Sequence, residues 1–160
     1  MILAAKSTYR IGVISDTHGL LRPQALVALR GSDLIVHAGD VDGPEVLEGL
    51  RRLAPVVAVR GNVDRGAFGV SLKEVEFIEV GGLTLYVRHI LDELDLEPAA
   101  AGFAAVIYGH SHVPSVEVRR GVVYFNPGSA GPKRFSLPVS LGVILVEGGR
   151  VEARLIELEG

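Results

Sequence analysis

Cysteine and tryptophan are absent from the 160-residue sequence, and methionine occurs once. Without cysteine the chain has no disulfides, thiolate metal ligands or cysteine nucleophiles, so a bound metal would need nitrogen and oxygen ligands. No hydrophobic run approaches the roughly 20 residues of a membrane-spanning helix. Residues 1–8 are too short and too mixed for a secretion signal. We therefore expect a cytoplasmic protein with no membrane partner.

The sequence also has no excess of basic residues, and its formal net charge is −3 at pH 7. Such a balance gives no general attraction to nucleic acid or to anionic membranes, and it argues against action on long nucleic acids. The sequence has neither a G-x-G-x-x-G nor a G-K-[ST] phosphate loop, and it lacks the G-x-S-x-G elbow of serine hydrolases. Any attraction of a charged substrate must therefore be local.

Three hydrophobic runs in the first half of the chain predict buried strands, each followed by a polar turn. Two intervening stretches have the hydrophobic spacing of amphipathic helices. The predicted strands cover residues 10–14, 34–38 and 56–60, and the predicted helices cover 20–29 and 44–53. Alternation of this kind is typical of βαβ units with a parallel sheet.

The second half of the chain predicts a second sheet. A helix is expected over residues 91–101, with Asp92, Glu93, Asp95 and Glu97 on its solvated face. The expected strands are a hairpin of 75–80 and 83–88, single strands at 104–108, 116–118 and 122–125, and a closing hairpin of 141–146 and 151–158. The composition, 48% hydrophobic and 22% charged, indicates a folded chain, and we expect one α/β domain over residues 1–160.

Chemically active side chains follow the predicted strands directly. Ligand sites of open α/β sheets lie beyond the carboxyl ends of the strands, which is where these side chains would meet. Seven candidates offer nitrogen or oxygen atoms: Asp16, His18, Asp40, Asn62, His89, His110 and His112. Seven ligands are too many for one tetrahedral ion and suit two ions about 3.5–4 Å apart that share a ligand. Asp40, at the tip of the middle strand, is the natural bridge, and the mixture of imidazole, carboxylate and amide suits Mn, Fe, Zn or Ni.

Structural roles compete with these chemical ones at several positions. Asp16 and Asn62 could cap turns, and His18 and His89 could be ordinary surface residues. Asp64 is expected to orient a ligand histidine, whereas His37, three residues before a strand tip, is expected in the core. Two alternatives stay open for four further residues, namely a contact with substrate or an ordinary turn or solvated loop: Asn126, Ser129, Lys133 and Arg134.

The order of these motifs resembles that of the calcineurin-like metallophosphoesterases, in particular their small bacterial and archaeal phosphodiesterase branch. The resemblance covers nearly the whole chain and rests on Asp16-x-His18, Gly39-Asp40, Gly61-Asn62-x-Asp64, the lone His89 and Gly109-His110-x-His112. It implies a four-layer αββα sandwich of two mixed sheets flanked by helices. It also implies that one metal binds Asp16, His18, Asp40 and His112, and that the other binds Asp40, Asn62, His89 and His110.

The function that this resemblance implies is hydrolysis of a small-molecule phosphodiester by water that two divalent ions activate, with Asp40, Asn62 and His110 as catalytic residues. Manganese is the expected metal, with nickel, zinc or iron as alternatives. In many larger members a histidine follows the asparagine and helps to protonate the leaving group, whereas this chain has Val63 there. Ile90 likewise replaces the glycine that commonly follows the lone histidine in the small branch. We therefore expect a preference for good leaving groups.

A non-catalytic scaffold on the same fold, similar to the small phosphoesterase-fold subunit of retromer, is the alternative from another class. A phosphomonoesterase or a nuclease remains open among the enzymes. The hydrophobic segment 68–72 is either a pocket wall or part of a contact between the subunits of a homo-oligomer. The sequence identifies neither the physiological substrate nor the oligomeric state.

Overall fold

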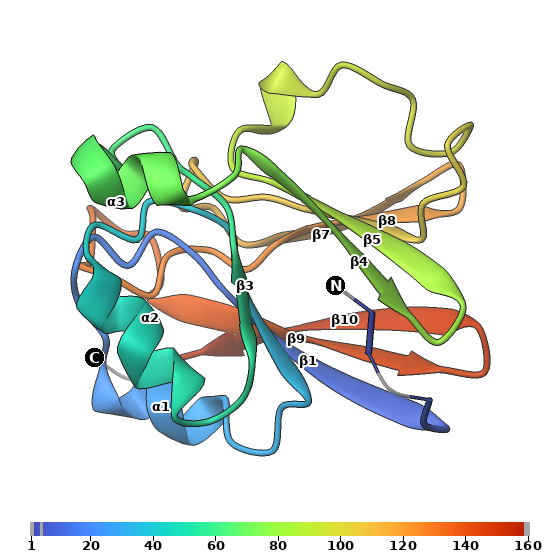
Figure 1. Ribbon diagram of the computed structural model, residues 1–160, viewed down its shortest axis with the longest axis horizontal. Helices are drawn as coiled ribbons and strands as arrows, with labels where there is room; N and C mark the ends of the chain where they lie inside the picture. Colours follow the sequence, from blue (N-terminus) through green and yellow to red (C-terminus); the bar gives the residue numbers. More distant parts are fainter. Residues whose placement is uncertain (1, 4, 159–160) are drawn as a thin grey trace.

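The computed structural model describes residues 2–3 and 5–158. Among these residues the chain forms two five-stranded sheets that pack face to face, with helices along the outer side of one of them (Figure 1). Both sheets mix parallel and antiparallel neighbours. This arrangement confirms the expected α/β sandwich of two mixed sheets. No described helix is long and hydrophobic enough to cross a membrane.

The first sheet is built around three parallel strands, β1 (Thr8–Ile14), β2 (Leu34–His37) and β3 (Val56–Ala58). Helices α1 (Pro23–Ala28) and α2 (Pro44–Arg51) connect them, and each begins with a proline, whose fixed φ suits the first turn of a helix. The antiparallel strands β9 (Ser140–Glu147) and β10 (Arg150–Glu157) complete the sheet in the order β10-β9-β1-β2-β3. These elements lie where the sequence predicts them, with ends shifted by a few residues.

The second sheet has its parallel strands at the centre and antiparallel strands at both edges. Its order is β4-β5-β6-β8-β7, and the β5–β6 and β6–β8 pairs are parallel. The strands are β4 (Val75–Val80), β5 (Leu83–Arg88), β6 (Ala105–Ile107), β7 (Ser115–Arg119) and β8 (Val122–Asn126). All five confirm strands that the sequence predicts.

The main hydrophobic core lies between the two sheets. Alternate residues of β1 point into it, so Ile11 and Val13 are fully buried there, and Leu85, Ile107 and Phe125 meet them from the second sheet. Fully burying a side chain of this size stabilises the fold by about 1.5–3 kcal/mol. Because both sheets share this core, their strand ends are held in a fixed relation to one another.

The predicted helix over residues 91–101 is wrong. The structure has only a 3-10 turn, η1 (Leu91–Glu93), followed by an irregular segment that leads to β6. Pro98 lies within the predicted range, and a proline in a helix interior removes a hydrogen bond and clashes with the preceding turn. Leu91, Leu94 and Leu96 still pack against the outer face of the second sheet, so the hydrophobic pattern reported burial rather than a helix.

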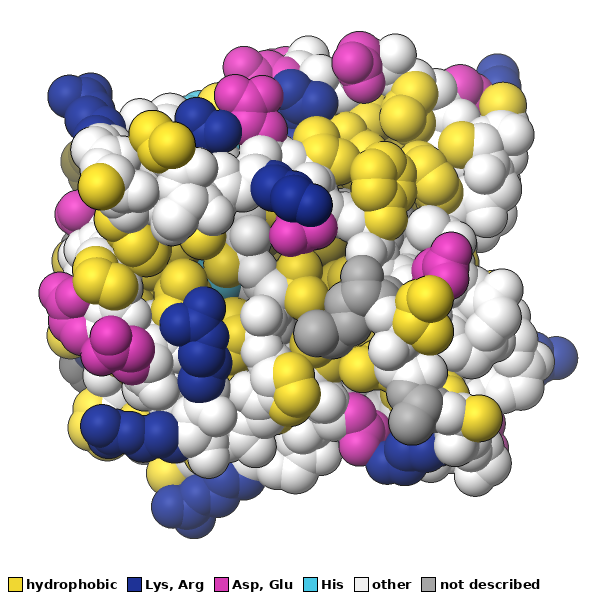
Figure 2. Space-filling view, viewed as in Figure 1, with side chains coloured by type: hydrophobic (Ala, Val, Ile, Leu, Met, Phe, Trp, Pro, Cys, Tyr) yellow, Lys and Arg dark blue, Asp and Glu magenta, His cyan; other side chains and the backbone are white. Residues whose placement is uncertain are grey.

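The outer face of the second sheet is therefore thinly covered. Hydrophobic side chains reach the surface near the β4–β5 hairpin and the segment after η1 (Figure 2). Phe77 is 48% exposed and contacts the rings of Tyr86 and Phe103, whose centroids lie 5.4 Å apart in a stacked arrangement. The fourth layer of the sandwich is a 3-10 turn and a loop rather than a full helix.

A short helix, α3 (Gly66–Ser71), was not expected from the sequence. It overlaps the hydrophobic segment 68–72, which the sequence left open as a pocket wall or subunit contact. Phe68 and Leu72 pack partly buried against the core between the first sheet and its helices. Its short length and its two glycines, Gly66 and Gly69, explain why the pattern gave no helical signal.

The six parallel strands all end at the same edge of the sandwich. This edge lies at the left of Figure 1, where the loops after β1, β2 and β3 face the loops after β5, β6 and β8. The residues that follow these strands form the site described next.

Candidate dinuclear metal centre

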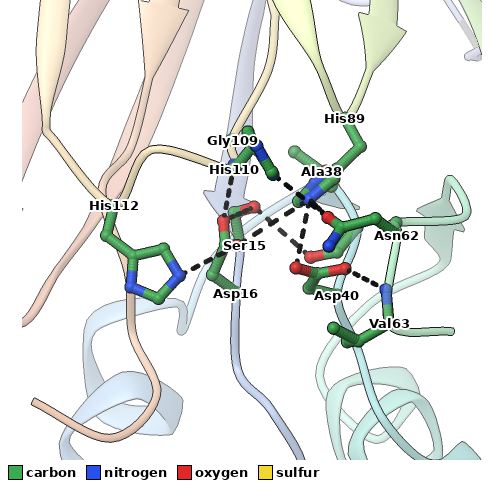
Figure 3. Close-up of polar contacts among 12 residues, drawn as sticks. Ser15, Asp16, Ala38, Asp40, Asn62, Val63, His89, Gly109, His110 and His112 are labelled. Atoms are coloured by element: carbon green, nitrogen blue, oxygen red, sulfur yellow. Dashed lines mark hydrogen bonds and ion pairs between the residues drawn. The ribbon is translucent and has the colours of Figure 1, made fainter. Parts of the chain in front are cut away.

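The seven candidate ligands from the sequence all lie at this edge, and six of them form two compact groups of donor atoms. Asp16, His18 and His112 form the first donor group. Asp40, His89 and His110 form the second, and in each group the donor atoms lie within 4.8 Å of one another. Asn62 joins the second group, because its Oδ1 is 3.0 Å from ring nitrogens of both histidines there (Figure 3).

The backbone around the donor groups is unusual. Positive φ angles occur at Asp16 (54°), His18 (47°), Asp40 (56°), His110 (72°) and His112 (64°). Left-handed backbone is uncommon for residues other than glycine and persists only where the surrounding structure enforces it. The loops after the strands are therefore held in conformations that turn these side chains inward.

Glycines precede several candidate ligands because the loops approach each other closely. A Cβ atom at Gly61 would overlap the Asp40 carboxylate and backbone, and one at Gly109 would overlap Ser15 Oγ and the Asp16 carboxylate. No larger residue fits at either position without moving a candidate ligand. Steric crowding therefore explains why glycine precedes Asn62 and His110.

The two carboxylate oxygens of Asp16 have different surroundings. Oδ2 accepts hydrogen bonds from Ser15 Oγ (2.6 Å) and from the backbone N–H of His110 (3.1 Å). Oδ1 is buried and has no hydrogen-bond partner among the described residues. Because a buried oxygen without a partner is costly, Oδ1 is suited to bind a cation.

The histidines of the first donor group converge on that oxygen. His112 Nε2 lies 3.2 Å from Asp16 Oδ1, and His18 Nε2 lies 3.3 Å from His112 Nε2. Ligands about 2.1 Å from a tetrahedral ion stand about 3.4 Å from one another. The spacing of these atoms therefore fits a single ion between them.

His89 presents a lone pair to the second donor group. Its Nδ1 is 2.7 Å from the carbonyl oxygen of Ala38 and donates to it, which leaves Nε2 as the acceptor of a neutral ring. Nε2 lies 3.2 Å from Asp40 Oδ2 and 3.0 Å from Asn62 Oδ1. Three acceptors that face one another need a proton or a metal ion between them.

Protonation and metal binding compete at His89. Burial lowers the pKa of its ring, but the hydrogen bond to Asp40 and the charges of Asp16 and Asp40 outweigh this and raise the pKa above its ordinary value. In the metal-free protein the ring therefore holds a proton more readily than a free histidine does. A metal ion at Nε2 would have to displace that proton, so its affinity would fall in acid.

Asp40 belongs to the second donor group and also approaches the first. Its Oδ2 is 3.2 Å from His89 Nε2 and 3.9 Å from His18 Nε2. Burial raises the pKa of Asp40, but hydrogen bonds from His89 and from the N–H of Val63 hold it below the ordinary value. The carboxylate is therefore ionised near neutral pH, the state in which it binds metal.

Asp64 supports the loops rather than a ligand histidine. Its carboxylate accepts hydrogen bonds from the backbone N–H groups of Val41 (3.3 Å), Asp42 (2.8 Å) and Gly61 (2.9 Å). These bonds tie the loop after β2 to the loop after β3. The prediction that Asp64 orients a ligand histidine is therefore wrong, because the hydrogen bonds that it accepts from the described residues all come from backbone N–H groups.

Asn126 and Ser129 hold loops in place, which decides the alternative that the sequence left open. Asn126 Nδ2 donates to Gly109 O and Ser111 Oγ, both at 3.1 Å, and so fixes the loop that carries His110 and His112. Ser129 Oγ donates to the carbonyl oxygen of Asp16 at 2.9 Å. Both residues are buried, so they position ligands and do not line an open pocket.

His37 is a core histidine, as the sequence predicts. It is fully buried, with Nε2 3.0 Å from Thr17 Oγ1 and Nδ1 accepting the N–H of Gly39 at 3.1 Å. Thr17 Oγ1 donates to Val41 O, so it accepts from His37 Nε2, and both ring nitrogens are satisfied in the neutral form. Burial lowers the pKa of His37 to about 4.

Access to the centre is from the side of Asn62 and His110. These two side chains are exposed, whereas Asp16, Asp40 and His112 are buried. Lys133 and Arg134 are also exposed, in a loop whose tip, Phe135, is 94% exposed. A phosphate contact of Lys133 or Arg134 stays a prediction.

Ser15 supports a candidate ligand, and sequence reasoning missed it. It is fully buried, and its hydroxyl bonds the Asp16 carboxylate. Ser15 is not part of a hydrophobic repeat or a known motif. Only its position next to Asp16, at the end of a predicted strand, could have indicated its role.

The fold and the two donor groups together define an α/β protein with a candidate two-metal centre. A family model described as the calcineurin-like phosphoesterase superfamily domain matches residues 9–149. The chain therefore belongs to this superfamily and is a metallophosphoesterase, as its motifs suggested. The family and the donor groups together imply divalent metal ions.

Two curated relatives cover most of the chain. A probable metallophosphoesterase of Methanothermobacter thermautotrophicus is 37% identical over 158 residues, which cover 91% of each chain. Phosphodiesterase YfcE of Escherichia coli is 32% identical over 155 residues, covering 81% of this chain and 84% of the relative.

Among solved structures, Vps29 of Entamoeba histolytica in complex with zinc has a TM-score of 0.69. It is 22% identical, and the match covers 92% of this chain and 98% of that one. At this identity the likeness shows the fold alone.

Proposed function

We propose that this protein is a metal-dependent phosphodiesterase whose two metal ions share Asp40. The observation that carries the proposal is the pair of adjoining donor groups, with the unpartnered Oδ1 of Asp16 in the first and the facing acceptors of Asp40, His89 and Asn62 in the second. Two divalent ions bound there would lower the pKa of a water between them and would bind the phosphoryl oxygens.

The chain's own residues have distinct parts in this proposal. Asp16, His18, Asp40 and His112 would hold one ion, and Asp40, Asn62, His89 and His110 would hold the other. Because Asn62 and His110 are exposed, they also lie where a substrate would enter and contact it first. The peptide N–H of Val63 donates to Asp40, and its hydrocarbon side chain cannot donate a proton to the leaving group. The enzyme should therefore favour leaving groups of low pKa.

Diesters are the proposed substrates because the E. coli relative carries the name phosphodiesterase at 32% identity. Manganese is the proposed metal, with nickel, zinc or iron as alternatives, because mixed imidazole, carboxylate and amide donors suit these ions. A cytoplasmic location, a single domain over residues 1–160, a small-molecule substrate and a homo-oligomer stay predictions.

The test is the initial rate on bis(p-nitrophenyl) phosphate and on p-nitrophenyl phosphate, after chelation and re-addition of Mn, Ni, Zn or Mg. We expect hydrolysis that returns with Mn or Ni and favours the diester. Asp40→Asn and His110→Ala should each lower it at least 100-fold, because the first replaces the shared carboxylate with a neutral amide and the second removes an imidazole donor. Asp92→Asn, which changes an exposed carboxylate on η1, is the matched control and should retain the wild-type rate.

Full activity in the Asp40→Asn or His110→Ala variant would contradict the proposal. No activity together with no bound metal would instead favour the non-catalytic scaffold. A stable partner complex that forms equally well in the Asp40→Asn variant would support that alternative.

A further inference from the structure

A small cavity lies beside the second donor group. Its volume is about 170 Å³, and Asn62 and His89 line it on the side of the candidate metal centre. Cavities that hold drug-sized ligands have about 300–1,000 Å³. This cavity therefore suits one small chemical group and not a whole nucleoside.

Two arginines, Arg60 and Arg88, also line this cavity. Both are half-buried, and neither forms an ion pair with a carboxylate of the described residues. The Nε atom of each is buried without an acceptor among those residues, and Arg88 makes only a long contact of 3.5 Å from Nη1 to Tyr86 OH. Guanidinium groups with free donors are the usual partners of phosphate, which they bind through two parallel hydrogen bonds.

Glu74 and Glu93 complete the charged lining, but they differ from the arginines in exposure. Both glutamates are exposed, so water screens their charges more strongly than those of the half-buried arginines. The balance of two cations and two anions also removes a general attraction for any anion. What remains is directional hydrogen bonding, which selects an oxyanion of the right shape.

The arginines lie next to the candidate ligands along the chain. Arg88 directly precedes His89, and Arg60 precedes Asn62 by two residues. Neighbouring Cα atoms are about 3.8 Å apart. A group bound by the arginines and a phosphoryl group at the donor atoms can therefore belong to one small molecule.

We propose that Arg60 and Arg88 bind a second phosphate group of the substrate, so that the preferred substrates are phosphodiesters that carry a further phosphate. This inference rests on the proposed phosphodiesterase function. In the reaction one water is consumed, the P–O bond to the leaving group breaks, and an alcohol and a phosphomonoester form. The second phosphate stays unchanged and only holds the substrate.

A matched pair of substrates tests the inference. Both are p-nitrophenyl esters of thymidine 5′-phosphate, and only one carries a 3′-phosphate, so the leaving group and the reacting diester are the same. We expect kcat/KM to be at least tenfold higher for the phosphorylated ester. Arg60→Gln and Arg88→Gln should each lower this ratio at least fivefold, whereas Arg30→Gln, an exposed arginine near the amino end of β2, should leave it unchanged.

A ratio near one in the wild-type enzyme, or the same ratio in the arginine variants, would overturn the inference while the phosphodiesterase function stands. If neither ester is hydrolysed, a binding measurement tests the phosphate subsite instead. Calorimetry with thymidine 3′,5′-bisphosphate and metal-free protein should give a Kd that both arginine variants raise at least tenfold. Equal affinity in wild type and variants, or binding of inorganic phosphate as tight as that of the bisphosphate, would contradict a subsite for the substrate's second phosphate.

Discussion

At the scale of single residues, the asymmetry of Asp16 explains how one carboxylate is prepared for a cation. Ser15 Oγ and the N–H of His110 occupy Oδ2, so only Oδ1 is left for an external partner. Groups that hydrogen-bond a ligand from behind fix its orientation, and their loss typically lowers metal affinity 10–100-fold.

We predict that Ser15→Ala weakens metal binding about tenfold, because Asp16 loses the hydrogen bond that orients it. Titration calorimetry with Mn²⁺ measures this directly, and excess metal should restore most of the activity. Ser32→Ala is the control, since the Ser32 hydroxyl bonds Leu29 O after α1 and contacts no candidate ligand. An unchanged affinity in Ser15→Ala would show that the backbone alone orients Asp16.

His37 links a single buried ring to the pH dependence of stability. Its pKa is about 4 in the folded protein and about 6.5 in an unfolded chain, so folding favours the neutral form. The stabilisation is complete above the unfolded pKa and is lost as pH falls from about 6.5 to 4. At pH 4.5 the loss amounts to about 2 kcal/mol.

We predict that His37→Gln removes this part of the acid sensitivity. In urea unfolding with a chelator present, the stability advantage of the wild type over the variant should shrink by about 2 kcal/mol between pH 7 and pH 4.5. The other titrating groups are common to both proteins and cancel in this difference. A difference that is constant with pH would mean that His37 does not titrate in this range.

At the scale of elements, the loops after β2 and β3 act as one unit because Asp64 accepts N–H groups from both. Two other segments show that hydrophobic spacing and helix propensity in the sequence can predict the wrong secondary structure. Residues 91–101 carry leucines at near-helical spacing but form only η1 and a loop, whereas residues 66–71 form α3 despite two glycines. Pro98 interrupts the first pattern, whereas packing of Phe68 against the core of the first sheet accompanies the second.

We predict that Asp64→Ala destabilises the fold by about 3 kcal/mol, because three N–H groups lose a charged acceptor. It should also lower metal affinity, since the loops that carry Asp40 and Asn62 come apart. Asp64→Asn keeps one carbonyl acceptor and should cost less than half as much. The measurement is chemical unfolding, with Asp92→Ala on exposed η1 as the control. Equal stability of Asp64→Ala and the control would contradict a linking role.

At the scale of the whole molecule, the candidate metal centre joins the two sheets. Asp16, Asp40 and Asn62 follow strands of the first sheet, and His89, His110 and His112 follow strands of the second. An ion held by both sets is a cross-link between the two halves of the sandwich. Metal binding should therefore stabilise the fold as a unit.

We predict that metal ions raise the thermal stability of the protein. A metal at 100 times its Kd stabilises the folded state by about 2.7 kcal/mol per site, which is about 8 °C in Tm for a chain of this size. Thermal unfolding with chelator and with Mn²⁺ measures the shift, and Asp40→Asn should reduce it. Bound ions without any rise in Tm would contradict the cross-link.

The sequence by itself determined the sandwich, its strands and the polar residues at the strand ends, because these follow from local periodicity and from motifs in a recognisable order. The tertiary structure alone decided which donor atoms meet, that Ser15, Asn126 and Asp64 support them, and that Arg60 and Arg88 share a cavity. The donor atoms and the cavity join residues from both sheets, and the supporting hydrogen bonds depend on how each loop folds. No local pattern in the sequence predicts distances between segments that meet only after the sheets have packed.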